Sequence, residues 1–178
     1  MFGFLRQFAR LLTGKVQPFE IALGAFFGVL LALTPSRAVD EGTGFLGMST
    51  LWLLLLFLFL ALRASIPIAL LLMGLFEILE RLFLGGLTSG SGRFLLEQLL
   101  PQSFAIGVSG AWPSAQLHTW WGFGGLLWGL LLGLALAIPF HVFVKRRIPA
   151  WREKYGQSKL VRAASFSLTE KAMSWWIG

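Results

Sequence analysis

The chain has 178 residues, of which 56% are hydrophobic and only 13% are charged, and its mean hydropathy is +0.75. Soluble domains carry about 25% charged residues, so half of the usual solvating charge is missing. A water-soluble fold would need a core larger than a chain of this length encloses, whereas a membrane protein needs only a lipid-facing surface. The sequence has no cysteine, which excludes disulfides, thiolate metal sites and a cysteine nucleophile.

The basic residues are unevenly distributed. The formal net charge is +7, and 8 of the 15 Lys and Arg residues follow residue 144, beside a long apolar stretch. In that position they indicate an orientation signal and a contact with anionic membrane lipids. No folded basic module accompanies them, so we do not expect a nucleic-acid partner.

The chain begins with an amphipathic leader, residues 1–17. Within residues 2–13, apolar residues recur at helical spacing and two arginines share the opposite side. The apolar positions are Phe4, Phe8, Leu11 and Leu12, and the arginines are Arg6 and Arg10. A helix lying in the membrane interface and a solvated leader both fit this pattern.

The first apolar stretch is short. Residues 19–33 contain a single charged residue, Glu20, and Thr34-Pro35 ends the stretch. Fifteen residues of helix cover about 22 Å, which is less than the hydrocarbon core. The stretch could cross a locally thinned bilayer, re-enter as a half-helix, or belong to a cleaved signal peptide with Ser36 and Ala38 near the cut.

Three further apolar stretches follow. Residues 45–62 predict a second span, and residues 66–87 a third, which charged residues interrupt. Residues 88–117 predict a Gly-, Ser- and Pro-rich connection, in which residues 93–100 fit a short amphipathic helix.

The last stretch is the clearest membrane segment. Residues 122–144 carry no charge, Trp120 and Trp121 precede them, and the basic cluster Lys145, Arg146 and Arg147 follows. Twenty-three helical residues cover roughly 35 Å, with an aromatic anchor at one interface and a basic stop at the other. Residues 145–178 then predict a basic cytoplasmic tail, with an amphipathic helix over residues 159–177.

These elements predict an all-α polytopic membrane protein with about four membrane segments, the first pair of which could be re-entrant. The whole chain, 1–178, forms one membrane domain whose membrane segments occupy residues 18–144. With four spans and both termini in the cytoplasm, twelve of the fifteen basic residues lie inside and two, Arg37 and Arg93, lie outside. This bias agrees with the positive-inside rule and favours an even number of crossings.

Small residues recur at every fourth position in the first and last apolar stretches. This spacing lines one face of a helix and lets two backbones approach closely in lipid. We therefore expect an interface between these two helices. The alternative is an inverted repeat, in which each stretch ends near a proline. The small residues are Gly24, Gly28 and Ala32 in the first stretch and Gly125, Gly129, Gly133 and Ala137 in the last.

One charged cluster, Glu77, Glu80 and Arg81, interrupts an apolar stretch. Glu77 and Arg81 are four residues apart and share a helix face. The cluster could line a polar cavity inside the bundle, or it could lie in solvent at the outer interface, which the following Gly85-Gly86 favours. His118 and His141 are far apart and lack acidic neighbours, so they predict no metal site.

Residues 18–35, PFEIALGAFFGVLLALTP, resemble a family of uncharacterised bacterial inner-membrane proteins with the pattern IALGxxxGxLLxLTP. A Leu-rich third segment with acidic residues, matched here by Glu77 and Glu80, and a basic tail with Ser158-Lys159-Leu160 are similar as well. The polar segment after Pro35 departs from the pattern. The resemblance implies a bacterial inner-membrane location and an accessory subunit linked to a large periplasmic envelope protein.

No phosphate-binding loop, zinc-protease motif or hydrolase elbow is present, so we expect neither an enzyme nor a cofactor. The sequence favours a non-catalytic accessory or scaffold subunit of a larger envelope assembly, in contact with membrane lipids and related to lipid transport. The alternative is a small homo-oligomeric transporter or channel that uses the charged cluster.

Overall fold

The computed structural model describes residues 17–37, 47–62 and 64–155, and the side chains up to residue 147. Within these ranges the chain is helical and forms no strand, which confirms the predicted all-α class. The helices predicted over residues 2–13 and 159–177 lie outside the described ranges. The elements are α2 (Pro18–Leu33), α3 (Thr50–Ala61), α4 (Ile66–Leu79), η1 (Glu80–Leu84), α5 (Gly85–Phe94), η2 (Leu95–Leu99), α6 (Gln102–Ala111), η3 (Pro113–Ala115) and α7 (Trp120–Tyr155).

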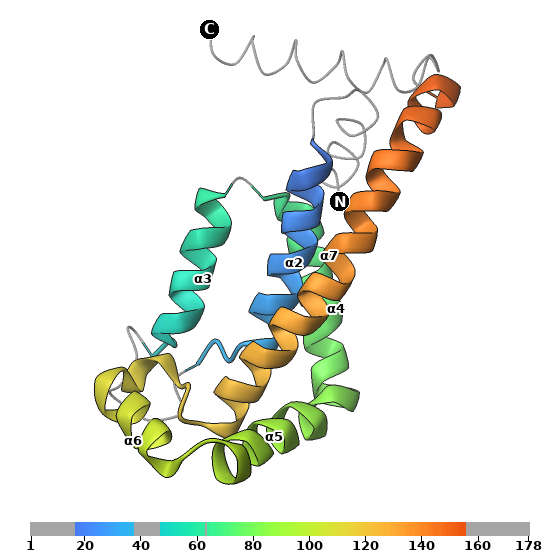
Figure 1. The fold of residues 1–178 in the computed structure, drawn as a ribbon. Coiled ribbons are helices and arrows are strands. Elements are labelled where there is room, and N and C mark those ends of the chain that lie inside the picture. The colour runs from blue at the N-terminus through green and yellow to red at the C-terminus, as the bar shows by residue number, and fades with distance from the viewer. Residues whose placement is uncertain (1–16, 38–46, 63, 156–178) are drawn as a thin grey trace, which may run out of the picture.

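Helix α2 is the centre of the fold, with α4 and α7 packed along it (Figure 1). Pro18 lies in its first turn, where a backbone N–H would have no intrahelical acceptor, so the missing N–H of proline costs no hydrogen bond. Thr34 and Pro35 end it, because proline disfavours helical backbone at the preceding residue, and Thr34 is extended. The first apolar stretch is therefore a helix with the predicted end.

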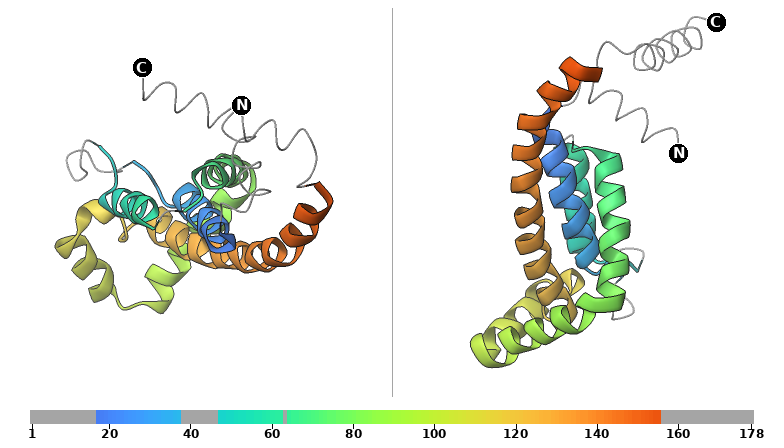
Figure 2. Two further views of the ribbon diagram at one scale, coloured as in Figure 1. Left: turned by 90° about the horizontal axis from the view of Figure 1, so that it is seen from above. Right: turned by 90° about the vertical axis from the view of Figure 1, so that its right-hand side faces the viewer.

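The four main helices alternate in direction along a common axis (Figure 1; Figure 2, right). Gly24 of α2 lies against Ser65, and Gly28 lies against Ala69, so α2 and α4 run parallel. In α7, Gly125 lies against Leu33 near the end of α2, whereas Gly133 lies against the earlier Phe26. Helices α2 and α7 therefore run antiparallel. Helix α3 follows α2 and precedes α4 in the chain, and it runs in the opposite direction to both (Figure 1).

Helix α3 is shorter than the second predicted span. It begins at Thr50 rather than at residue 45 and has 12 residues. The segment before it turns at Gly47, whose φ of +75° suits glycine, and the Ser49 N–H then donates to the Ser36 carbonyl at 3.0 Å. This bond and the bridge between Arg37 and Met48 close the loop between α2 and α3.

The predicted connection after residue 87 is wrong, because the chain stays helical from α4 to Leu99. The π-helical turn η1 replaces the expected stop, and α5 then crosses the end of the bundle (Figure 1). Gly92 shows why this helix contains glycine. A side chain at Gly92 would collide with the Trp120 carbonyl, so the small residues of α5 allow it to cross α7 closely.

Helix α7 has 36 residues and continues past the basic cluster that was expected to end the span. Its segment Trp120–Arg147 is the one described helix that is long and apolar enough to cross a bilayer. Only 17% of its most apolar window is buried within the chain. A core helix of a soluble protein would be mostly buried, and this window is not.

Candidate functional site

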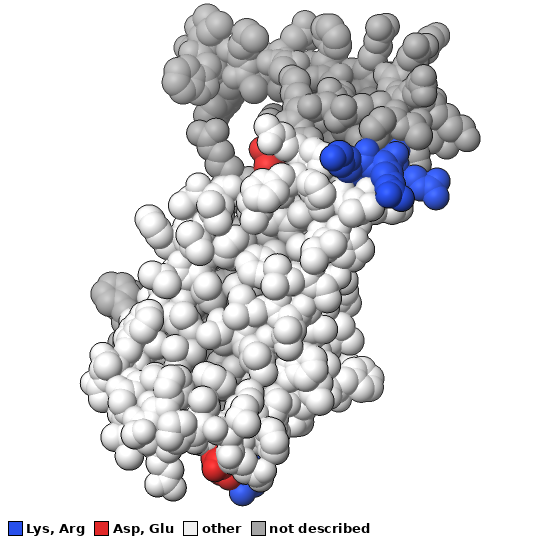
Figure 3. Space-filling model, viewed as in Figure 1, with Lys and Arg blue, Asp and Glu red and all other residues white. Residues whose placement is uncertain are grey.

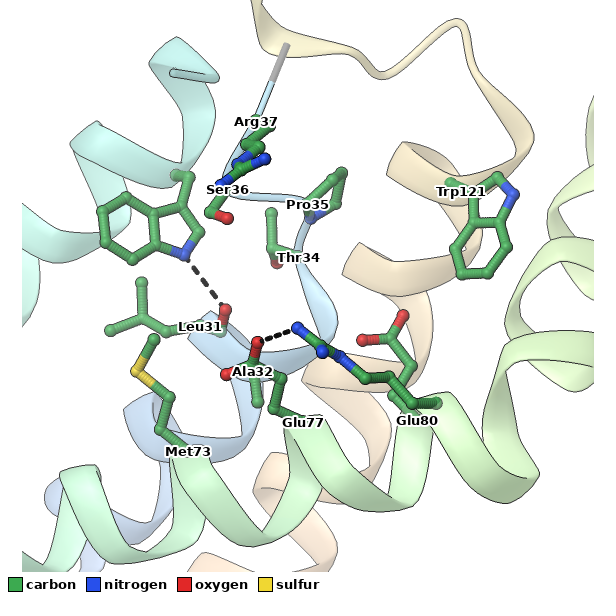
Figure 4. Close-up of a pocket in the computed structure, with 12 residues that line it drawn as sticks. Leu31, Ala32, Thr34, Pro35, Ser36, Arg37, Met73, Glu77, Glu80 and Trp121 are labelled. Carbon is green, nitrogen blue, oxygen red and sulfur yellow. Dashed lines mark hydrogen bonds and ion pairs between the residues drawn. The ribbon is translucent and has the colours of Figure 1, made fainter. Parts of the chain in front are cut away.

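A pocket of about 550 Å³ opens where α2, α4 and α7 converge, at the end of the bundle that α5 covers (Figure 4). This volume falls in the range of small-molecule sites. The lining combines apolar and polar side chains from five elements of the fold. These residues are Leu31, Ala32, Thr34, Pro35, Ser36, Arg37, Trp52, Met73, Glu77, Glu80, Arg81 and Trp121.

The end of α2 forms one wall of the pocket. Because the helix stops at Pro35, the backbone turns outward and presents Thr34, Ser36 and Arg37 in succession (Figure 4). Thr34 is only 1% exposed, and its Oγ1 has no hydrogen-bond partner in the part of the chain that is described. A buried hydroxyl without a partner is uncommon in folded proteins, so this atom marks a place where something polar belongs.

The charged cluster forms the opposite wall. Arg81 donates to the Glu77 carboxylate at 2.7 Å, with side-chain exposures of 76% and 47% respectively. Glu80 is half-buried, and its carboxylate points toward the side where Pro35 and Trp121 lie (Figure 4). The cluster therefore has features of both predicted alternatives. It lines a pocket, as a polar cavity would require, and it also reaches the surface at one end of the bundle.

Two tryptophans frame the pocket. Trp52 donates its indole N–H to the Leu31 carbonyl at 3.0 Å, which satisfies a carbonyl that the end of α2 leaves open. Trp121 stands at the start of α7, on the far side of Glu80 (Figure 4). Met73 and Leu31 complete the apolar side. The pocket is therefore amphiphilic.

Beyond the pocket the bundle is filled with apolar side chains. Two clusters of buried residues occupy the space around α2. They include Phe27, Leu30 and Leu31 on one side and Ala25, Val29, Leu33 and Leu72 on the other. The polar lining thus stops at one end of the described bundle and does not continue along it.

The small residues pack helices, but the glycines of α2 have a different partner from the one predicted. A Cβ at Gly24 would lie 2.6 Å from the Ser65 carbonyl oxygen, and one at Gly28 would lie 2.6 Å from that of Ala69. These glycines therefore face α4, whereas we expected them to face α7. Ala32 is buried beside the pocket.

The glycines of α7 do face α2. A side chain at Gly125 would collide with the Leu33 carbonyl, and Ala137, further along, is half-buried. The two glycine stretches lie in unlike surroundings, so the packing lends the inverted-repeat alternative no support. In order, Gly125, Gly129 and Gly133 lie against Leu33, Leu30 and Phe26.

The basic cluster Lys145, Arg146 and Arg147 is exposed at the other end of α7 (Figure 3). Twenty-four residues separate Trp121 from Lys145, which corresponds to roughly 36 Å of helix. Since a hydrocarbon core is about 30 Å thick, the pocket and the basic cluster are spaced like the two faces of one bilayer. Figure 3 also shows a small group of charged side chains at the opposite end of the molecule.

Sequence reasoning named only Ala32, Glu77, Glu80 and Arg81 of the lining residues as site residues, and it missed the other eight, among them Thr34, Arg37 and Trp52. Thr34-Pro35 was interpreted only as a helix stop, and Arg37 only as an outside charge. The signal that could have found them was the order polar, proline, polar, basic directly after a buried helix. Trp52 carried no usable signal, because its partner is a backbone carbonyl.

Comparison of the chain with models of known protein families, with curated proteins and with solved structures finds no match.

Proposed function

We propose that the chain is a multi-pass inner-membrane protein in which α2, α3, α4 and α7 lie across the bilayer. The support is the packing of α2 along the apolar part of α7, from Gly133 to Gly125. If α7 crosses the membrane, then α2 and the helices around it share its depth. Helix α3 is about 18 Å long, so the bilayer near it is thinned or its polar ends reach the interface.

The proposed orientation puts both termini in the cytoplasm and the pocket at the outer face. It rests on the exposed basic cluster at the far end of α7 and on the alternating helix directions. The chain has no cysteine, so single-cysteine variants report on one position each. A cysteine at the exposed Ser103 of α6 should react with a membrane-impermeant thiol reagent in intact spheroplasts. A cysteine at Lys145 should react only after permeabilisation, and the reverse pattern would refute the orientation.

Within that membrane, we propose a non-catalytic accessory subunit that holds a lipid at the outer surface for a larger envelope assembly. The observation that carries this proposal is the amphiphilic pocket, which has a polar lining at one end of the bundle and is closed beneath by apolar residues. Such a site can hold a headgroup but offers no polar route through a single chain. Its lining has hydroxyls and carboxylates but no histidine to activate a nucleophile.

Helix α6 supports the existence of a protein partner. It has no buried residue, and it exposes Phe104 and Ile106 at the pocket end, near the exposed Trp112. The experiment is a pull-down of the tagged chain from native membranes in mild detergent, followed by mass spectrometry. A stoichiometric larger partner is expected. A stable monomer with no co-purifying protein would refute the accessory role.

The alternative, a homo-oligomeric transporter or channel, draws on the charged cluster in the pocket. Reactive cysteines at Glu77 and Arg81 would not separate the two functions, because both residues are partly exposed. Cysteines at Ala69 and Leu72, which are buried between α2 and α4, do separate them. Reaction of these deeper cysteines with a polar thiol reagent would favour transport, and protection would favour the lipid-holding role.

A further inference from the structure

The pocket has polar groups that find no partner among the described residues. Glu77 and Arg81 already pair with each other, so their charges cancel locally. Arg37 and Glu80 form no ion pair with any residue in the described ranges, and they lie on different walls, one on the end of α2 and one on η1. Among the described residues, Arg37 therefore has no negative partner and Glu80 has no positive partner of its own.

Thr34 supplies a second, independent indication of a ligand. Its hydroxyl is buried, lines the pocket and lacks a partner within the described chain. In Figure 4 its oxygen points into the pocket, on the side that faces the charged wall. A threonine hydroxyl donates one hydrogen bond, and a phosphate oxygen is a strong acceptor for it.

We propose that the pocket binds the headgroup of a phospholipid that carries both a phosphate and a primary ammonium group. The phosphate would lie between Arg37 and the Thr34 hydroxyl, and the ammonium would donate to the Glu80 carboxylate. The apolar side, with Leu31, Met73 and Trp52, would take the glycerol end of the lipid. This inference rests on the proposed membrane placement, because it needs the pocket at the level of the headgroups.

The charge balance selects this class over other common phospholipids. An anionic lipid without an amine would satisfy Arg37 and leave Glu80 facing a second negative charge. A choline lipid has a positive charge but no N–H to donate to the carboxylate. The two arginines and two glutamates of the lining sum to zero, which matches a zwitterion.

The test is native mass spectrometry of the full chain purified in detergent and incubated with equal amounts of three lipids. These are phosphatidylethanolamine, phosphatidylcholine and phosphatidylglycerol. We expect the ethanolamine lipid to be retained about tenfold more than either of the others, the size of one charge-assisted hydrogen bond. Glu80→Gln should remove most of this preference. Thr34→Val should instead lower the retention of all three lipids together, because each of them carries the phosphate. Glu97→Gln, on the surface pair outside the pocket, is the matched control and should keep both the preference and the retention.

The Glu80→Lys variant controls for loss of binding through misfolding. It should reverse the order of retention and favour phosphatidylglycerol, a gain that an unfolded chain cannot show. Equal retention of the three lipids, an unchanged preference in Glu80→Gln, or unchanged retention of all three lipids in Thr34→Val would overturn the proposal. Full displacement of the lipid by soluble phosphoethanolamine would also overturn it, since the ligand would then be the free headgroup.

The assay is independent of orientation, because detergent gives access to both ends of the bundle. Failure of the cysteine-labelling experiment with lipid preference intact would refute the proposed topology alone. Correct topology without a lipid preference would refute the headgroup site alone.

Discussion

Helices α2 and α3 have similar composition and opposite surroundings. Both are short and strongly apolar, yet eleven of the sixteen residues of α2 are buried and only four of the twelve in α3. The side chains of Leu54, Phe57 and Leu60 of α3 are exposed. Apolar character alone therefore does not determine whether a helix in this chain lies at the centre or at the edge.

The difference follows from residue size. Helix α2 has Ala22, Gly24, Ala25, Gly28 and Ala32, so the backbones of two other helices can approach it closely. Helix α3 has Leu, Phe or Trp at every position between its first residue, Thr50, and its last, Ala61. Lipid is as apolar as leucine, so helices associate through close packing, and small residues identify the central helix.

The largest expected effect tests this burial directly. Phe27→Ala in α2 removes a ring that is 2% exposed and contacts Phe26 and Phe59. It should lower the free energy of unfolding by about 3–5 kcal/mol. Phe57→Ala in α3, where the ring is 73% exposed, should change it little. Thermal unfolding in one detergent measures both, and equal losses would contradict the distinction between the two helices.

Alanine substitutions at two glycines should change the stability by smaller amounts and in opposite directions. Gly28→Ala places a Cβ 2.6 Å from the Ala69 carbonyl oxygen and should destabilise the bundle by about 1–3 kcal/mol. Gly74→Ala in α4 meets nothing within 4 Å and should stabilise its helix by about 0.5–1 kcal/mol. Melting temperatures of the two variants should move in opposite directions. A shift of the same sign in both would refute the role of Gly28 in close packing.

The sequence predicted the helical class and the end of α2, because apolar runs and a Thr-Pro stop are local signals. It did not predict helix α5. Gly85, Gly86 and Gly92 were interpreted as breakers, but Gly92 serves the crossing over α7 and the π-helical turn η1 carries the helix on. Whether a glycine ends a helix or packs one depends on a neighbour that is distant in the chain.

The candidate site was predictable in part for the same reason. Glu77 and Arg81 were identified as a pair, since four-residue spacing on a helix is a local property. Their meeting with Thr34 and Arg37 depends on the parallel packing of α4 against α2, which sequence spacing cannot reveal. The partner of the small residues in α2 was wrong on the same account.

The hydrogen bond that attaches α3 to α2 gives a third effect, similar in size to that of Gly28→Ala. Trp52→Phe should cost about 1–3 kcal/mol, because the buried Leu31 carbonyl loses its donor. Trp112→Phe, at an exposed tryptophan, is the control and should cost less. The loss of tertiary contact can be measured by thermal unfolding together with protease sensitivity of the α2–α3 loop. Equal stability of both variants would show that the Trp52 bond does not hold α3.

The smallest expected effect comes from two surface ion pairs, and it tests at which depth of the membrane the pocket lies. The pairs Glu77–Arg81 and Arg93–Glu97 have the same spacing and similar exposure, but only the first lines the pocket. If both lie at the outer interface, Glu77→Gln and Glu97→Gln should each cost less than about 0.5 kcal/mol, as exposed helix pairs do. If Glu77 instead lies within the hydrocarbon, its loss leaves Arg81 uncompensated at a cost of about 2.5–3.5 kcal/mol. Unfolding of the two variants in lipid nanodiscs distinguishes these cases. A large loss for Glu77→Gln alone would put the pocket below the headgroups and remove the basis for a headgroup site.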